Sequence, residues 1–465
     1  MGERVYFDIT DIVRFAGSHD RVAGIPRVHF NLISHLSRTH GGEVVRCIFH
    51  HSAARGMVEF DPSSLFADDE FDASTLLQRL GLEAPHRYLP RERTIKNYLR
   101  RFDGNKPLRA WKKLDVHVSA RWLPQRLAAM GLARPVQVAP LALHEVKALP
   151  PGSRQVILSI DNAETLQLAR EHRARGGDVV QMVYDLIPQT CQALFAPERI
   201  REFTGWLDQI VALRPRALCI SAWTARDLRE YIGNDAADWD IAVVPLAHEL
   251  DGFERNARVP MPASAEARLP SAPFVLCVGT LENRKNGVGL LRAWQQVIDR
   301  LGERAPDLVF AGRHGWHIEE FLSLMKSPGL AGKVRVVESP SDHDLAWLYG
   351  HCLFTAYPSL YEGWGLPVGE SAWFGKYCVA SKASSVPEVC GDLIDYVDPH
   401  DPADIAAKLL AALADPALVA RREAAIRAAV LRRWTDVADH VFRCVVGTGA
   451  AAVLAPTASP RAALS

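Results

Sequence analysis

Short apolar runs alternate with longer amphipathic segments along almost the whole chain. Segments such as Gly289–Leu301 and Asp344–His351 have the apolar spacing of helices, and the runs between such segments have the length of buried strands. These runs are Val5–Phe7, Val44–Phe49, Val156–Ser159, Val179–Tyr184, Ala217–Ile220, Ile241–Val244, Phe274–Val278, Leu308–Phe310, Val334–Val337, Leu353–Ala356 and Tyr377–Ala380. Because strands that alternate with helices build parallel sheets from βαβ units, the pattern predicts an α/β protein.

A proline-rich segment with few apolar periods, Glu249–Ala272, separates two such α/β halves. The chain has 465 residues, which is too long for one ordinary domain. We expect an N-terminal domain over residues 1–250, a linker over 251–272, a C-terminal domain over 273–425, a C-terminal helix over 426–448 and a disordered tail over 449–465.

Composition narrows the class of protein. Apolar residues make up 48% of the chain and charged residues 23%, as in soluble globular proteins. Lys and Arg number 54 and are balanced by 54 Asp and Glu, so the overall charge does not favour nucleic acid as a partner. No apolar run reaches the roughly 18 residues of a membrane-spanning helix, the N-terminus lacks a signal-peptide pattern, and the cysteines lack Cys-x-x-Cys spacing. We expect a cytoplasmic protein with reduced thiols.

The most informative motif contains two carboxylates on either side of a glycine-rich turn. Glu362 and Glu370 flank Gly-Trp-Gly-Leu-Pro, which is predicted to connect a strand to a helix. Pro367 suits the first helical position, which places Glu370 in the first turn and Glu362 in the loop before it. The backbone N–H groups of residues 363–365 would then lie at the positive end of the helix dipole. This pattern indicates an anion site with a hydroxyl-binding acid on either side, as a sugar nucleotide requires.

A second motif opens the C-terminal half. A buried strand ends at Gly279, and Arg284 and Lys285 follow in the loop. Loops after the carboxyl ends of parallel strands are where doubly wound sheets bind ligands. The basic pair is therefore a candidate to bind a diphosphate and to neutralise its charge as it leaves, without a metal ion. The alternative is a surface pair that caps a turn.

Two Asp-x-Asp segments match the spacing of a metal site. Asp238 and Asp240 lie in an acidic, loop-like segment, and Asp342 and Asp344 lie where a helix begins. We interpret both pairs as helix caps or surface acids. The histidines form no zinc-binding pattern, so no metal site is predicted.

Together, the motifs of residues 273–410 resemble the retaining glycosyltransferases of the GT-B fold, in particular family 4. The resemblance runs in order through six segments, which are Gly279–Asn286, Phe310–Trp316, Ser341–Tyr349, Glu362–Glu370, Ser384–Val389 and Val397–Pro402. A Glu-x7-Glu pair alone is weak evidence for this family, whereas the ordered set of six segments is specific to it. The resemblance implies two facing Rossmann-like domains with a cleft between them, and a last helix that packs back on the N-terminal domain.

The resemblance also implies roles for the residues of these motifs. Glu370 would hydrogen-bond the nucleotide ribose, Glu362 and the neighbouring amides would hold hydroxyls of the donor sugar, Arg284 and Lys285 would hold the diphosphate, and Glu338 would lie near the base. The implied donor-binding residues are Gly279, Thr280, Arg284, Lys285, Glu338, Glu362, Gly363, Trp364, Gly365, Leu366 and Glu370. Many relatives have Arg where Thr280 stands, and Arg284 is the candidate to supply that charge.

The N-terminal half resembles the family more loosely. Its first strand, loop and helix would place Gly24 and Arg27 near the reaction, and the alternative is a loop-to-helix boundary with a solvated Arg27. Relatives often have His where Tyr184 stands. Asp185 is a candidate to orient an acceptor or sugar hydroxyl, or else a turn-initiating residue before Pro188. With Glu362, Lys285 and Arg284, Asp185 makes up the predicted catalytic set.

One segment is strongly basic. From Arg87 to Lys113 the chain contains ten Lys or Arg but only two acidic residues, and four aromatic residues are interleaved with the basic ones. Such a segment can contact an anionic membrane surface from the cytoplasmic side. The alternative is a solvated helical face whose aromatic side chains turn to the core.

We therefore predict a metal-independent hexosyltransferase that retains anomeric configuration. The donor is a nucleoside diphosphate sugar, with GDP-mannose favoured because the variants around Arg284 and Asp185 resemble bacterial enzymes of O-antigen and capsule assembly. The acceptor would be a growing, lipid-linked surface glycan of a lipopolysaccharide or exopolysaccharide. No further cofactor is expected. Two alternatives remain, which are a GT-B nucleotide-sugar epimerase and a non-catalytic sugar-nucleotide-binding subunit of a glycan assembly complex.

Overall fold

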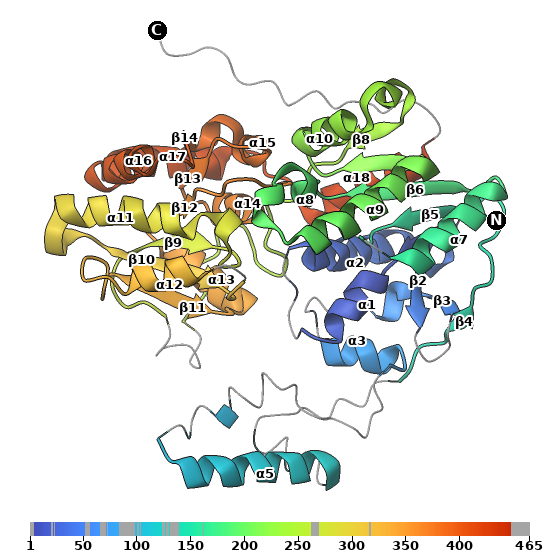
Figure 1. The fold of residues 1–465 in the computed structure, drawn as a ribbon, viewed down its shortest axis with the longest axis horizontal. Coiled ribbons are helices and arrows are strands. Elements are labelled where there is room, and N and C mark those ends of the chain that lie inside the picture. The colour runs from blue at the N-terminus through green and yellow to red at the C-terminus, as the bar shows by residue number, and fades with distance from the viewer. Residues whose placement is uncertain are drawn as a thin grey trace. The chain divides into compact units, whose positions relative to one another are not determined.

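The computed structural model of the chain, whose elements are labelled in Figure 1, divides into two compact units, Met1–Gly177 and Asp178–Ser465. The residues that the structure describes are 4–19, 22, 24–51, 56–65, 71, 73–82, 98–99, 102, 104–122, 126, 130, 139–160, 162–261, 269–315 and 318–447. The tail expected over residues 449–465 and the basic residues from Arg87 to Arg101 lie outside this set.

The first unit contains a mixed sheet with strand order β4-β3-β2-β1-β5. Its strands are β1 (Val5–Asp8), β2 (Val45–His51), β3 (Gly56–Phe60), β4 (His144–Glu145) and β5 (Arg154–Ile157). Its helices are α1 (Thr10–Ala16), α2 (Ile25–Val44), α3 (Ala73–Arg79), α5 (Lys106–Trp122) and α7 (Ala163–Ala174), with the 3-10 turn η1 (Pro62–Ser64). Strand β1 is parallel to β2 and β5, and β3 is antiparallel to β2 and β4. All four residues of β1 are buried, as its apolar run predicts.

The second unit begins with the parallel strands β6, β7 and β8. Their bounds are β6 (Asp178–Val183), β7 (Arg216–Cys219) and β8 (Ile241–Val243). The segments between them include α8 (Ile187–Thr190), η2 (Gln192–Leu194), α9 (Pro197–Leu213), α10 (Ala222–Ile232) and η3 (Gly233–Asp238). Ser221 precedes α10, and its Oγ accepts a hydrogen bond from Thr224 N at 2.9 Å, which caps the start of the helix.

A six-stranded parallel sheet follows, in the order β11-β10-β9-β12-β13-β14. Its strands are β9 (Phe274–Val278), β10 (Asp307–Gly312), β11 (Val334–Glu338), β12 (Thr355–Tyr357), β13 (Cys378–Ser381) and β14 (Asp395–Val397). The helices and 3-10 turns are η4 (Asn283–Lys285), α11 (Gly287–Leu301), η5 (Gly302–Arg304), α12 (Glu319–Met325), α13 (Asp342–His351), α14 (Leu366–Trp373), α15 (Val386–Cys390), η6 (Gly391–Leu393), α16 (Pro402–Ala414), α17 (Pro416–Ala428) and α18 (Trp434–Val446).

Helices cover both faces of this sheet. On one face, α11, α12 and α16 bury a cluster that includes Leu291, Trp294 and Leu409 against Val275 and Phe310 of the strands. On the other face, α13 packs through the stacking of Trp347 on Phe274, whose side chain alternates with that of Val275. A parallel sheet buried on both faces is the arrangement that continuous apolar strands favour.

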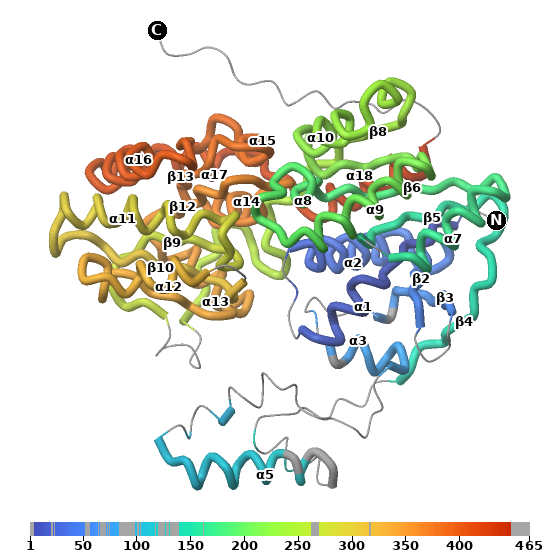
Figure 2. The backbone as a smooth tube through the Cα atoms, viewed as in Figure 1, coloured from blue at the N-terminus to red at the C-terminus, as the bar shows by residue number. Residues whose placement is uncertain are grey.

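Helix α18 lies beside segments far away in sequence. The Arg216 guanidinium of β7 donates hydrogen bonds to the carbonyls of Cys444 and Gly447, and Trp434 N donates to Glu249 Oε2 at 2.9 Å. Figure 2 shows the red end of the chain returning alongside the green segments of the second unit. Residues 429–433 are not helical, and α18 begins only at Trp434. The helix is therefore shorter than the one expected over residues 426–448.

All eleven predicted strands are present within two residues of their expected bounds. The strands that the apolar pattern missed are β3, β4 and β14, of which two lie at sheet edges and have few apolar positions. The compact units divide at residue 177, and the domain boundaries at residues 250 and 272 stay a prediction. In the described part of the chain, no helix has the length and apolar character that spanning a bilayer requires. All eight cysteines are free thiols.

Candidate functional site

The predicted site residues of the second unit gather where the strand order of the six-stranded sheet reverses. After β9 the chain continues to β10 on one side, and β12 lies on the other side of β9. The loops after β9 and β12 therefore leave neighbouring strands at the same carboxyl edge. Leu360 N donates to Arg284 O at 2.9 Å and joins the two loops. This reversal point is where open parallel sheets bind ligands.

The loop after β9 holds the basic pair in a short 3-10 turn. Asn286 follows the turn with a φ of 57°, caps α11 by accepting from Gly289 N at 3.2 Å, and donates to Pro358 O at 3.0 Å. Its side chain thus ties the turn to the neighbouring loop. Gly279, Thr280, Lys285 and Tyr357 line a small cavity beside this turn.

The loop after β12 leads into α14 through Gly365, whose φ is 119° and which precedes the first helical residue, Leu366. Pro367 is therefore the second helical residue and not the first, and Glu370 is the fifth and lies just beyond the first turn. The helix starts one residue earlier than predicted because Gly365 adopts a positive φ that ends the loop there. Glu370 is 3% exposed, and its Oε2 accepts from Tyr349 Oη at 2.8 Å.

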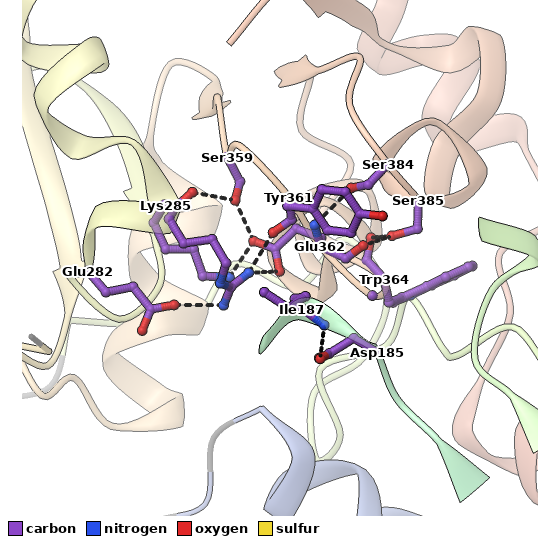
Figure 3. Close-up of polar contacts among 12 residues, drawn as sticks. Asp185, Ile187, Glu282, Lys285, Ser359, Tyr361, Glu362, Trp364, Ser384 and Ser385 are labelled. Carbon is purple, nitrogen blue, oxygen red and sulfur yellow. Dashed lines mark hydrogen bonds and ion pairs between the residues drawn. The ribbon is translucent and has the colours of Figure 1, made fainter. Parts of the chain in front are cut away.

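Glu362 lies at the centre of an ion-pair cluster (Figure 3). Lys285 Nζ lies 2.5 Å from Glu362 Oε1, and Arg284 Nη1 lies 2.7 Å from Glu362 Oε2. Arg284 Nη2 also lies 2.6 Å from Glu282 Oε1. The hydroxyls of Tyr357 and Ser359 donate to Glu362 Oε1 at 2.8 and 2.6 Å. Two cations and two carboxylates are thus held together at the end of the sheet.

The cluster determines the charge state of its members. Burial alone would raise the pKa of Glu362, but the positive charges of Arg284 and Lys285 outweigh it and lower the pKa to about 2. Burial also lowers the pKa of Lys285, and attraction to Glu362 opposes that change. Burial and the negative charge of Glu362 raise the pKa of Tyr357 well above its ordinary value, so its hydroxyl stays protonated as a donor.

Gly363 brings Asp185 to this cluster. A Cβ on Gly363 would lie 2.1 Å from Tyr184 O and 2.9 Å from Asp185 Cβ, so only glycine fits between the two segments. Asp185 follows β6, and its Oδ1 accepts from Ile187 N at 3.1 Å (Figure 3). Burial raises the pKa of Asp185, and the nearby charge of Arg284 opposes this rise.

The remaining predicted residues are distributed around this centre and beyond it. Trp364 is 5% exposed, and its indole N–H has no hydrogen-bond partner among the residues whose placement is described. Glu338 ends β11 and is exposed. Gly24 and Arg27 belong to the first unit, where Gly24 has a φ of 59° and precedes α2. Arg27 is 9% exposed, which does not fit a solvated side chain.

Several residues of the site carried no role in the sequence prediction. Ser384 Oγ accepts from Glu362 N, and Ser385 Oγ donates to Glu362 O, each at 2.8 Å. Tyr357 ends an apolar strand and Ser359 lies just beyond it, so the sequence pattern indicated only a strand residue and a turn residue. The Ser-Ser pair was part of the motif set, but its spacing alone did not indicate that it fixes the backbone of Glu362.

Within the described ranges, no group of three or more His, Cys, Asp or Glu is placed to hold a metal ion. Asp344 forms a capping box with Ser341 at the start of α13, as interpreted from the sequence. Asp240 pairs with Arg216 at 2.5 Å and thus belongs to the packing around β7.

Comparison with known proteins matches this sheet and its loops to a family. Residues 264–430 match the model of the family described as glycosyl transferases group 1. The O-antigen chain mannosyltransferase B of Escherichia coli is 30% identical over 236 residues, which are 51% of this chain and 61% of that protein. The serotype-specific mannosyltransferase WbdA of Escherichia coli is 32% identical over 244 residues, which are 50% of this chain and 29% of that protein. The matches thus span less than two thirds of either relative.

The fold is shared over almost the whole chain. The crystal structure of WaaG, a glycosyltransferase involved in lipopolysaccharide biosynthesis, has a TM-score of 0.56 at 12% identity and covers 96% of this chain and 100% of that one. This likeness confirms the predicted fold class, with two Rossmann-like α/β domains of the GT-B type.

Proposed function

We propose that the chain, whose residues 264–430 match the glycosyl transferases group 1 family, transfers a hexose from a nucleoside diphosphate sugar to a growing bacterial surface glycan. The observation that carries the proposal is the pair of cations, Arg284 and Lys285, held at the strand-order reversal beside Glu362. The mannosyltransferase names of the two relatives support mannose as the sugar. GDP-mannose as the donor rests on the resemblance of the sequence variants around Arg284 and Asp185 to bacterial enzymes of O-antigen and capsule assembly.

The cations supply the main chemical contribution. A diphosphate leaving group gains negative charge as the bond to the sugar breaks, and fixed positive groups stabilise that charge. Arg284 and Lys285 are each held by several contacts, which keep both cations at the end of the sheet where a phosphate would bind. In this account, no metal ion is needed for the donor.

Other residues would position the two substrates. Glu370, in α14, would bind the ribose, Glu338 would lie near the base, and the amides of residues 363–365 would hold the donor sugar. Asp185 lies against Gly363, so it is placed to orient a hydroxyl of the sugar or of the acceptor. We propose retention of anomeric configuration, with the leaving phosphate assisting removal of the acceptor proton.

The test is a thermal-shift titration without metal, using GDP, UDP, dTDP and ADP, on the wild type, Lys285→Ala and Arg292→Ala. Arg292 is an exposed cation on α11 that pairs with Glu320 and serves as the matched control. We expect GDP to stabilise the wild type and Arg292→Ala but not Lys285→Ala. Transfer of mannose from GDP-mannose to a lipid-linked acceptor then tests the reaction. Stabilisation by none of the nucleotides would contradict the donor site and favour the non-catalytic alternative.

We also propose that helix α5 contacts an anionic membrane surface on the cytoplasmic side. Trp111, Leu114 and Val118 lie on one side of this helix and are 52%, 63% and 46% exposed. Lys106 and Lys113 of the same helix are also exposed, so an apolar stripe stands beside positive charge. This combination favours the interface of a bilayer that contains anionic lipid.

Sedimentation with vesicles tests this contact. The wild type should pellet with vesicles that contain phosphatidylglycerol and remain in the supernatant with neutral vesicles. Leu114→Glu should lose the binding, whereas Val430→Glu should keep it, because Val430 is 98% exposed but lies outside α5. Equal binding by Leu114→Glu and the wild type would exclude the stripe as the contact.

A further inference from the structure

Glu362 has more partners than a sugar-binding carboxylate needs. Its Oε1 is contacted by Lys285, Tyr357 and Ser359, and its Oε2 by Arg284. The residue is 6% exposed. Most of its hydrogen-bonding capacity is thus used by the protein itself, and half of these contacts come from the two cations of the diphosphate site.

The cations also have several partners within the protein. Arg284 Nη1 donates to Tyr361 O and Glu362, each at 2.7 Å, and Nη2 donates to Glu282 at 2.6 Å. Lys285 Nζ donates to Tyr357 Oη at 2.7 Å besides Glu362. A diphosphate that binds these cations therefore meets groups whose charge a carboxylate already balances. A second anion at these cations repels the carboxylate of Glu362, so the two anions compete for the same positive charge.

We propose that Glu362 is an internal competitor of the diphosphate, a role that rests on the proposed function. It holds Arg284 and Lys285 when the site is empty, yields them when the donor binds, and takes them back when the nucleoside diphosphate leaves. A free diphosphate carries more negative charge than its sugar ester, so the product binds the two cations more tightly than the donor does. Competition by Glu362 then promotes product release.

The surroundings of Glu362 fit such an exchange. Tyr357 and Ser359 donate neutral hydrogen bonds to Oε1, so the carboxylate keeps two partners after the cations turn to a phosphate. An unpaired buried carboxylate would be costly, and these hydroxyls reduce that cost. Ser384 and Ser385 fix the backbone of Glu362, so the movement is confined to side chains.

The test measures binding of inorganic pyrophosphate and of the nucleoside diphosphate that stabilises the wild type, by calorimetry without metal. Glu362→Gln removes the competing charge at the same size. We expect it to bind both ligands about tenfold more tightly, which corresponds to about 1.4 kcal/mol. The product-inhibition constant of the nucleoside diphosphate should fall by the same factor. Glu320→Gln, a change of an exposed acid in α12 that pairs with Arg292, should bind pyrophosphate as the wild type does.

Glu362→Asp keeps the negative charge but shortens the side chain, and it serves where the Gln variant does not fold. It too should bind pyrophosphate more tightly, because the shorter carboxylate no longer reaches both cations. Binding that either variant weakens, or leaves unchanged, would show that Glu362 organises the cations instead of competing for them, and would overturn this inference alone. A wild type that binds neither pyrophosphate nor any nucleoside diphosphate would contradict the proposed function as well.

Discussion

Two regions of the second unit hold a glutamate carboxylate against N–H donors by different means. Glu362 is buried, and its partners are the side chains of Arg284 and Lys285. Glu388 is exposed and accepts from the backbone N–H groups of Ala222 and Trp223, at 2.7 Å each, in the first turn of α10. Side-chain cations can turn toward another anion, whereas the N–H groups of a helix cannot. The first region therefore suits ligand exchange, and the second suits a permanent link between segments.

A short chain of contacts joins the two regions. Tyr361, the neighbour of Glu362, donates to Asp227 Oδ2 at 2.6 Å and accepts from Trp223 Nε1 at 2.7 Å. Asp227 and Trp223 both belong to α10, whose first turn contacts Glu388. The helix is thus held on one side of the loop that carries Glu362. Substitutions of Glu362 should therefore alter ligand binding, whereas substitutions of Glu388 should alter only the link between segments.

The largest effect on stability should come from Arg284→Ala. This change leaves two carboxylates, Glu362 and Glu282, which are 6% and 7% exposed, without their shared partner. Removing one partner of a buried ion pair costs about 3–5 kcal/mol of unfolding free energy. Urea unfolding followed by tryptophan fluorescence measures the loss. The matched control is Arg201→Ala in α9, an exposed arginine that pairs with Glu198, which should cost less than about 1 kcal/mol. Similar losses in the two variants would show that the buried cluster stabilises the fold no more than an exposed ion pair does.

A smaller effect should appear in the pH dependence of stability. The folded pKa of Glu362 is about 2, below its ordinary value of 4.5, so its contribution is present above about pH 4.5 and is lost as the pH falls toward 2. A shift of this size corresponds to about 3 kcal/mol, of which about 2 kcal/mol should disappear between about pH 6 and about pH 3. The measured quantity is the difference in unfolding free energy between the wild type and Glu362→Gln. Parallel pH profiles of the two proteins would show that the cations do not hold Glu362 ionised.

Most of the fold could be predicted because the strands of a parallel sheet are continuous apolar runs. The pattern located eleven of the twelve described strands that pair in parallel, including β9 with its bounds unchanged. It missed the parallel edge strand β14 and the antiparallel strands β3 and β4, which contain polar positions or lie at a sheet edge where burial is incomplete. The start of α14 was displaced by one residue, since a positive φ at Gly365 cannot be read from a Gly-X-Gly spacing.

The members of the site were predictable, but their pairing was not. Arg284, Lys285 and Glu362 were each singled out, yet nothing in the sequence indicated that Glu362 would bind both cations, because these residues lie about 77 positions apart in the chain. The contact of Gly363 with Tyr184 likewise depends on how β6 and the loop after β12 pack. Glu388 shows the same limit, since its motif was recognised and its partner α10 was not.

The smallest effect should come from Glu388→Ala, and its salt dependence tests the comparison most directly. Loss of a carboxylate at a helix N-terminus costs about 1 kcal/mol, and an exposed charge is screened by salt. The loss of unfolding free energy should therefore shrink in about 1 M NaCl, whereas the loss in Arg284→Ala should persist because that cluster is buried. Glu388→Gln keeps only one of the two oxygens that accept from Ala222 and Trp223, so it should retain part of the loss of unfolding free energy at high salt. Pyrophosphate binding should be unchanged in both Glu388 variants. A Glu388 variant that altered pyrophosphate affinity as Glu362→Gln does would show that the contact of Glu388 with α10 is energetically coupled to the ligand site.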